Sequence, residues 1–214
     1  MNKSSGHKHD GTTSEGPKIA TLSSPVTGDL TFPGNITFSN AITIPETPTS
    51  DTDAASKGYV DGAWKVGQIV YTLETAYTEG TTKLADLDDD IPQQTDGTEI
   101  MTRSITPTSA TNGLLINVVL NIGSNSGTSV IGCLFQDSTA NALASWMCLN
   151  DAAGYGHQIV MQYYMVAGTT SETTFKVRVG NHNASDEWNV NGSSSGRLFG
   201  GTAISSITIT EIVI

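Results

Sequence analysis

Two histidines near the start of the chain have the type and spacing of metal ligands. His7 and His9 are separated by one residue, and residues i and i+2 of an extended chain face the same side. Three copies around an axis would therefore supply six imidazole nitrogens, a complete octahedral shell. Ligand type alone admits Fe²⁺, Ni²⁺ or Zn²⁺ at such a site. The alternative is a terminal segment, or the remnant of a tag, that binds nothing.

Two loop-like segments of the second half mix aromatic rings with amides and carboxylates. They span residues 150–157 and 181–189. Ring faces stack on a partner and side-chain amides select it, so these segments are candidates for binding a carbohydrate or a protein. The side chains that we single out are Tyr155, His157, His182, Asn183 and Trp188. The alternative for the tryptophan is that it anchors its own loop or a subunit contact.

Other motifs that could carry chemistry are weaker. Residues 192–196 match G-x-S-x-G around Ser194, but a nucleophile at this motif needs a strand before it and a helix after it. The aspartates of residues 86–90 could wrap Ca²⁺, but they lack the glycine and the distal glutamate of an EF-hand, and a solvated loop is the alternative. The sequence contains no P-loop, HExxH or cysteine-rich zinc pattern. We therefore expect a protein that is not an enzyme.

The elements that must position these residues begin with an internal repeat. Between residues 30 and 44, an apolar-Thr-apolar unit recurs every six residues, and its two apolar side chains point to one face of a minimal strand. Three units in one chain cannot bury that stripe, so we expect other copies to cover it in an intertwined trimeric β stem. An irregular loop with chance spacing is the alternative. The apolar positions are Leu30, Phe32, Ile36, Phe38, Ile42 and Ile44.

The rest of the chain divides into a neck and a head. Ser50 or Asp51 can cap a short helix that runs towards Trp64. Beyond it, eight apolar runs separated by turn residues predict an antiparallel β-sandwich of jelly-roll type. These runs are 68–73, 99–105, 114–122, 130–135, 143–149, 158–166, 174–179 and 206–214. We thus expect a docking segment (1–21), a stem (22–48), a helical neck (49–66) and a head (67–214), a mainly β protein.

Charge and composition exclude several partners. The net charge of the 214-residue chain is −11, which opposes phosphate binding and argues against nucleic acid as a partner. No apolar stretch approaches the roughly 20 residues of a membrane span, and the N-terminus lacks a signal peptide. The chain's two cysteines, Cys133 and Cys148, lie in apolar runs, which predicts buried thiols rather than a disulfide. We expect no membrane insertion and assembly in a cytoplasm.

Three stretches resemble the tail-fibre and receptor-binding tip proteins of bacteriophages. Residues 6–11 (GHKHDG) with 16–19 (GPKI) resemble the opening of such fibres, and residues 54–61 (AASKGYVD) resemble a segment that follows fibre stems. The head resembles a fibre-tip domain through its closing ITITEI, residues 207–212. Only one HxH pair is present, where long fibre tips carry several.

The resemblance implies a homotrimer in the virion that docks on another tail or capsid protein and binds a receptor on the host surface. It also implies one Fe²⁺ per trimer at His7 and His9. The alternative function is a structural head-fibre or decoration protein without a receptor. Host, receptor and docking partner are not encoded in any recognisable motif.

Overall fold

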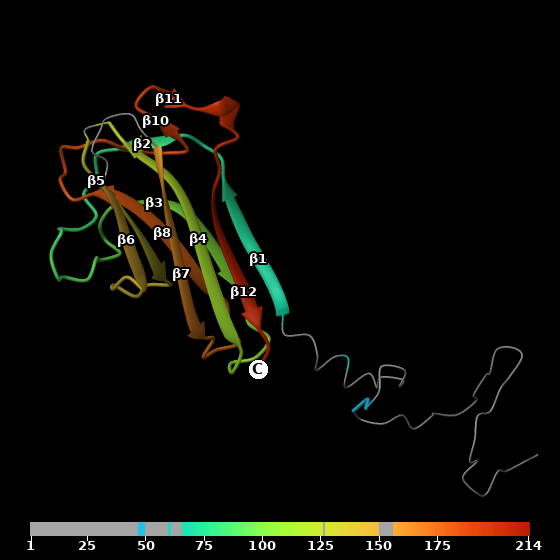
Figure 1. Ribbon diagram of the computed structural model, residues 1–214. Helices are drawn as coiled ribbons and strands as arrows, with labels where there is room; N and C mark the ends of the chain where they lie inside the picture. Colours follow the sequence, from blue (N-terminus) through green and yellow to red (C-terminus); the bar gives the residue numbers. More distant parts are fainter. Residues whose placement is uncertain (1–46, 50–59, 61–65, 126, 150–155) are drawn as a thin grey trace, which may run out of the picture. The chain divides into compact units, whose positions relative to one another are not determined.

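The computed structural model describes residues 47–49, 60, 66–125, 127–149 and 156–214 (Figure 1). The predicted docking segment with His7 and His9, the stem positions from Leu30 to Ile44, nearly all of the predicted neck, and Tyr155 lie outside the described residues. The described residues thus belong almost entirely to the head.

The head is an antiparallel β-sandwich of two layers (Figure 1). The first sheet has the strand order β1-β12-β4, with β7 on the other side of β4. Its strands are β1 (Val66–Glu74), β4 (Gly113–Ser124), β7 (Gly156–Val166) and β12 (Ser205–Ile212). The second sheet has the order β3-β8-β5-β6. Its strands are β3 (Thr98–Ile105), β5 (Ser129–Gln136), β6 (Ala144–Leu149) and β8 (Thr173–Asn181).

Short elements complete one end of the sandwich. β9 (Trp188–Val190) pairs with the end of β4, and β2 (Thr78–Gly80) pairs with β9. β10 (Gly192–Ser193) and β11 (Gly196–Arg197) form a small hairpin, followed by the 3₁₀ turn η1 (Phe199–Gly201). Since the long strands are distributed between the two layers in the manner of a jelly roll, the predicted fold class of the head is confirmed.

The eight predicted strands are all present, each to within two residues at either end. β12 shows why they could be recognised. Its inward positions Ser205, Ile207, Ile209 and Glu211 are buried and its outward positions are only half-buried, which is the period-two alternation of a strand with one covered face.

The core lies between the two sheets. Inward side chains of β4, β7 and β12 in the first sheet meet those of β5 and β8 in the second. Fully burying one large aliphatic or aromatic side chain stabilises the fold by about 1.5–3 kcal/mol. Its largest fully buried members include Leu114, Ile116, Leu120, Ile122, Leu134, Ile159, Phe175, Ile207 and Ile209.

A second, smaller core lies outside the second sheet, beneath the loop of residues 81–97. Leu84 from this loop packs on Ile131, Cys133 and Phe135, which project from the outer face of β5. The loop is fastened to the sheet through its backbone: the Leu84 amide donates to the Asn181 carbonyl at 2.8 Å. β5 is consequently buried on both faces, while the acidic run 86–90, farther along the same loop, is exposed.

The two cysteines lie on opposite faces of the second sheet. Cys133 projects towards the covering loop, whereas Cys148 pairs with Val130 in register and packs against the main core. Cys133 is fully buried, as predicted, and Cys148 is half-buried. Burial raises the pKa of the Cys133 thiol to about 11, against the lowering effect of a hydrogen bond with Ser145.

One carboxylate is buried between β1 and β12. Glu211 has no exposed surface and accepts hydrogen bonds from Asn112 Nδ2 (2.6 Å), Gln68 Nε2 (2.7 Å) and the Thr108 amide (2.7 Å). Burial alone raises the pKa of this carboxyl, but the bonds from Asn112, Gln68 and Thr108 outweigh it and lower the pKa to about 2. The charge thus fastens the 106–112 loop to the sheet.

Candidate functional site

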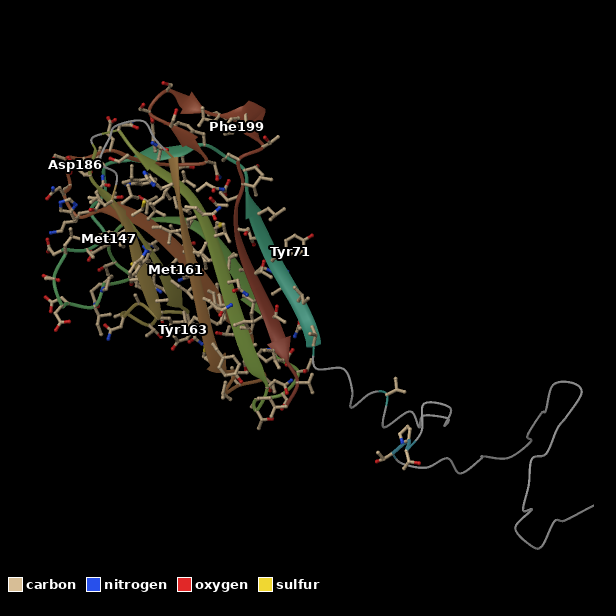
Figure 2. The ribbon with its side chains drawn as sticks, in the orientation of Figure 1. Tyr71, Met147, Met161, Tyr163, Asp186 and Phe199 are labelled. Carbon is tan, nitrogen blue, oxygen red and sulfur yellow. The ribbon has the colours of Figure 1, made fainter. Side chains whose placement is uncertain are left out.

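The outer face of the first sheet carries large apolar side chains that nothing in the described part of the chain covers. On β1, Ile69, Tyr71 and Leu73 are 57 %, 59 % and 53 % exposed. Figure 2 shows Tyr71 on the outside of β1. We call this surface the bare face. Its other strongly exposed members, on β7, are Val160, Tyr164 and Val166.

The register of the sheet explains why these residues share one face. Ile69 pairs with Thr210, which pairs with Leu115, which pairs with Tyr164. The next outward row runs from Tyr71 through Thr208 and Asn117 to Gln162, and the one after it from Leu73 to Val160. The bare face therefore has apolar rows on both sides of a polar row, in which Gln162 Nε2 donates to Asn117 Oδ1 at 2.9 Å.

A second exposed apolar region lies at the edge of the sandwich formed by β6 and β7. Trp146 is 66 % exposed and Leu149 is 63 % exposed, both on the edge strand β6. The partly buried Tyr163 and Met165 of β7 pack against the core beside this edge. Exposed apolar surface of this kind marks interaction sites, so the head has two such regions on different sides.

The loops at the end of the sandwich opposite the C-terminus hold the described candidates for receptor binding. His182 and Asn183 are in the β8–β9 loop, where Asn183 Nδ2 lies 2.9 Å from His182 Nε2 and 3.2 Å from Asp186 Oδ2. His157 is at the start of β7, opposite Ile122. Figure 2 shows Asp186 and Phe199 at opposite corners of this end, so the predicted residues do not converge on one site.

Trp188 is the candidate that the structure corrects. Its side chain is fully buried, and its Nε1 donates to Thr82 Oγ1 at 3.1 Å. It lies over Gly80, where an added Cβ would be 2.6 Å from the indole ring. The prediction that Trp188 contacts a receptor directly is wrong; the tryptophan anchors its own loop, which was the alternative.

A pocket that the sequence did not point to lies beside His157. It has a volume of about 600 Å³ and is formed where the η1 segment meets the ends of β4 and β7. Phe199 at its rim is 77 % exposed. The signal for it in the sequence was slight, a Leu-Phe pair before two glycines, because only the fold brings Asn121, Gln158 and Phe199 together.

The serine motif and the acidic run lie in surroundings that do not suit the chemistry considered for them. Ser194 is in the turn of the β10–β11 hairpin, which is not the strand-turn-helix arrangement that exposes a nucleophile. Asp86 pairs with Lys83 at 2.6 Å. No group of three or more His, Cys, Asp or Glu side chains suited to a metal occurs among the described residues. Within that part of the chain there is also no helix with the length and apolarity of a membrane span.

Comparison with solved structures finds distant likenesses to the head. The head is similar to the structure of Eiger TNF from S. frugiperda, with 8 % identity, a TM-score of 0.40, and coverage of 68 % of this chain and 93 % of that one. It is also similar to the EclA C-terminal domain, a sugar-binding protein, with 13 % identity, a TM-score of 0.32, and coverage of 65 % and 86 %. Likenesses this distant carry no argument about function. No curated protein matches the sequence significantly.

Fold and exposed surfaces thus define an antiparallel jelly-roll head with uncovered apolar faces. The family whose sequence pattern matches is the Pgp3 C-terminal domain, over residues 85–214. The chain belongs to this family. The Pgp3 C-terminal domain is a trimeric, TNF-like jelly-roll domain, and the homotrimer expected from the sequence is consistent with it.

Proposed function

We propose that the protein is a homotrimeric, non-enzymatic fibre protein of a bacteriophage that attaches the virion to a host-cell surface. The observation that carries this proposal is the bare face, because a soluble head gains nothing from exposing Ile69, Tyr71 and Leu73 unless another molecule covers them. Another copy of the same chain is the occupant supported by the trimeric family. The motifs that resemble phage fibres support the role in attachment.

The trimer that we propose joins two different surfaces. A closed ring of three copies cannot use one self-complementary patch, since threefold contacts are heterologous. The head offers two exposed apolar regions on different sides: the bare face with Tyr71, and the β6 edge with Trp146 and Leu149. In our proposal, the β6 edge of one head packs on the bare face of the next.

Two new aspartates, one on the bare face and one away from both exposed apolar regions, test this arrangement. Leu73 on the bare face is 53 % exposed, and Ser194 is exposed in the turn of the β10–β11 hairpin. An aspartate at an interface must be buried without a partner, which is costly, whereas in a solvated turn it costs little. Leu73→Asp should therefore raise the concentration at which the trimer dissociates by roughly tenfold or more, and Ser194→Asp should not. Mass photometry over a dilution series measures both; a wild-type monomer at micromolar concentration overturns the proposal.

Attachment is tested separately from assembly. Labelled wild-type trimer should bind cells of at least one strain in a panel of bacteria, and excess unlabelled trimer should compete. If the trimer forms but binds no strain, the structural alternative of a head-fibre or decoration protein replaces ours. Pull-down of virion proteins from infected cells would then identify what the N-terminus docks on.

The N-terminal histidines extend the proposal to a metal. We propose that His7 and His9 of three chains hold one Fe²⁺, because six imidazoles form an octahedral shell. Elemental analysis of tag-free trimer, grown with adequate iron, should give one metal ion per three chains. A His7→Ala, His9→Ala variant that retained the metal would contradict it.

A further inference from the structure

The pocket beside His157 combines an exposed ring with fixed amides. Its volume of about 600 Å³ falls within the range of about 300–1,000 Å³ that is usual for small-molecule sites. The residues that matter to its chemistry are Asn121, His157, Gln158, Phe199 and Thr202.

The described residues that line this pocket are uncharged. None of them is Asp, Glu, Lys or Arg, although the chain as a whole carries a net charge of −11. The hollow beside the 81–97 loop is the opposite case, since four aspartates line it. A lining without charges has no counter-ion for an ionic ligand, so the pocket suits an uncharged one.

Phe199 gives the pocket an aromatic platform. The residue has a φ of 49°, in the left-handed region, which is unusual for a bulky side chain and is seen more often at binding sites. Thr202 holds this conformation: its amide and its Oγ1 both donate to the Phe199 carbonyl, at 3.2 and 2.9 Å. The result is a ring that is 77 % exposed at the rim, placed at the end of the head in Figure 2.

The amides of the pocket are fixed from behind. Asn121 donates through Nδ2 to the Ile204 carbonyl at 2.6 Å, and its own backbone amide donates to Ser205 Oγ at 2.9 Å. Gln158 Nε2 donates to Asn121 Oδ1 at 3.1 Å, which leaves Gln158 Oε1 and the second Nε2 hydrogen for a ligand. Fixed donors and acceptors select a ligand at little entropic cost.

We propose that this pocket binds an uncharged sugar unit of a cell-surface glycan. The C–H face of a pyranose ring packs on Phe199, and its hydroxyl groups exchange hydrogen bonds with the free carboxamide atoms of Gln158. The inference rests on the proposed attachment function and names its ligand class. The competing occupant is a neighbouring copy that covers Phe199 in the trimer.

Saturation-transfer NMR on the full-length trimer tests the proposal. The probes are neutral hexoses, N-acetylhexosamines, deoxyhexoses and their disaccharides, with glucuronic and galacturonic acids as charged counterparts. We expect the wild type to bind at least one neutral probe and neither uronic acid. Phe199→Ala should weaken that binding by roughly tenfold, since it removes the stacking platform, whereas Phe199→Tyr, which keeps the ring, should retain it.

A second pair of variants separates the pocket from its surroundings. Gln158→Ala removes a cross-strand amide pair inside the pocket and should weaken sugar binding. Gln93→Ala removes a glutamine–asparagine pair of the same kind, with Asn141, on the loop over the second sheet and should leave sugar binding unchanged. Absence of binding to every neutral probe, or equal binding by Phe199→Ala, overturns the proposal. A loss of trimer mass in Phe199→Ala also overturns it, because the ring is then a subunit contact.

Cell binding distinguishes failure of this inference from failure of the proposed function. If Phe199→Ala trimers still attach to the cells that the wild type binds, attachment stands and the sugar pocket does not. If the wild type binds a neutral sugar but no cells of the strain panel, the pocket stands and attachment fails.

Discussion

The two outer faces of the sandwich differ in how far described segments of the chain cover them. Over the second sheet, the loop 81–97 places Leu84 on Ile131 and Phe135, and all three are almost completely buried. Over the first sheet, no described segment covers Tyr71 or the other residues of the bare face. One face is completed by a described loop of the same chain, and the other keeps its apolar side chains exposed in the described part of the chain.

The difference shows where stability and association come from. Burial under the loop contributes to the folding of a single head, because Phe135 loses all its exposed surface there. In the proposed trimer, burial of Tyr71 contributes only when copies meet, so it depends on protein concentration. Substitutions under the loop should therefore change the unfolding free energy of the head. Substitutions on the bare face should instead change the mass of the assembly in solution.

The largest effect is expected from Phe135→Ala. This substitution leaves a cavity between the loop and β5 and should lower the unfolding free energy by about 3–5 kcal/mol. Urea denaturation followed by circular dichroism measures it. The control is Leu87→Ala on the exposed part of the same loop, with a change within about 0.5 kcal/mol. A small loss in Phe135→Ala would mean that the loop contributes little to the head.

The head could be predicted from the sequence because its long strands alternate and end at turn residues, as β12 does. The short strands β2 and β9 were missed, since three residues show no period, and they form only because the fold brings β9 to the end of β4 and β2 to β9. Trp188 was misread for the same reason: it stands in a polar stretch, and its burial depends on Gly80 and Thr82, more than a hundred residues earlier in the chain.

The bare face could be predicted only in part. β7 has apolar residues on both of its faces, such as Ile159 inward and Val160 outward, and a strand with two apolar faces needs two covers. Whether the second cover is a loop of the same chain or another copy does not follow from the pattern. β5 has the same kind of sequence, and the chain covers it itself.

The second-largest effect is a dependence of the unfolding free energy on pH. It comes from Glu211 on β12, in the sheet that carries the bare face. Glu211 has a pKa of about 2 when folded, against an ordinary value of 4.5. Because the folded pKa is the lower one, its contribution is present above pH 4.5 and is lost as the pH falls towards 2. The unfolding free energy should therefore fall by about 3 kcal/mol over this range, since each pKa unit corresponds to about 1.4 kcal/mol.

Unfolding measured from pH 7 to pH 2 tests this contribution against a matched variant. Glu211→Gln cannot ionise, and its amide group faces donors, so it should be less stable than the wild type at pH 7 and lack this part of the acid dependence. Glu172→Gln on the surface serves as the control. An acid transition of equal size in Glu211→Gln would assign it to other carboxylates.

A smaller effect is expected from Tyr71→Ala on the bare face. The side chain is already partly covered in the single head, so completing its burial in a trimer is worth about 1–2 kcal/mol per contact, or roughly tenfold in affinity. Sedimentation equilibrium measures the trimer affinity. Unfolding of the dissociated chain should change little, and an unchanged affinity would place the subunit contact elsewhere.

The smallest effect concerns the rate at which Cys133 is labelled. This rate reports how often the 81–97 loop opens over β5, without a change in the stability of the head. In a Cys148→Ser background, Cys133 is the only thiol; it is fully buried beneath the loop, and its pKa of about 11 leaves roughly a hundredfold less thiolate than the ordinary value of 9.0 would. Labelling with a thiol reagent at about pH 8 should therefore be very slow in the native protein and fast in urea. Leu84→Ala loosens the cover and should accelerate native labelling, whereas Leu73→Ala, on the other face, should not. Equal acceleration by both variants would mean that labelling follows global unfolding, and that the loop over β5 does not open as a separate unit.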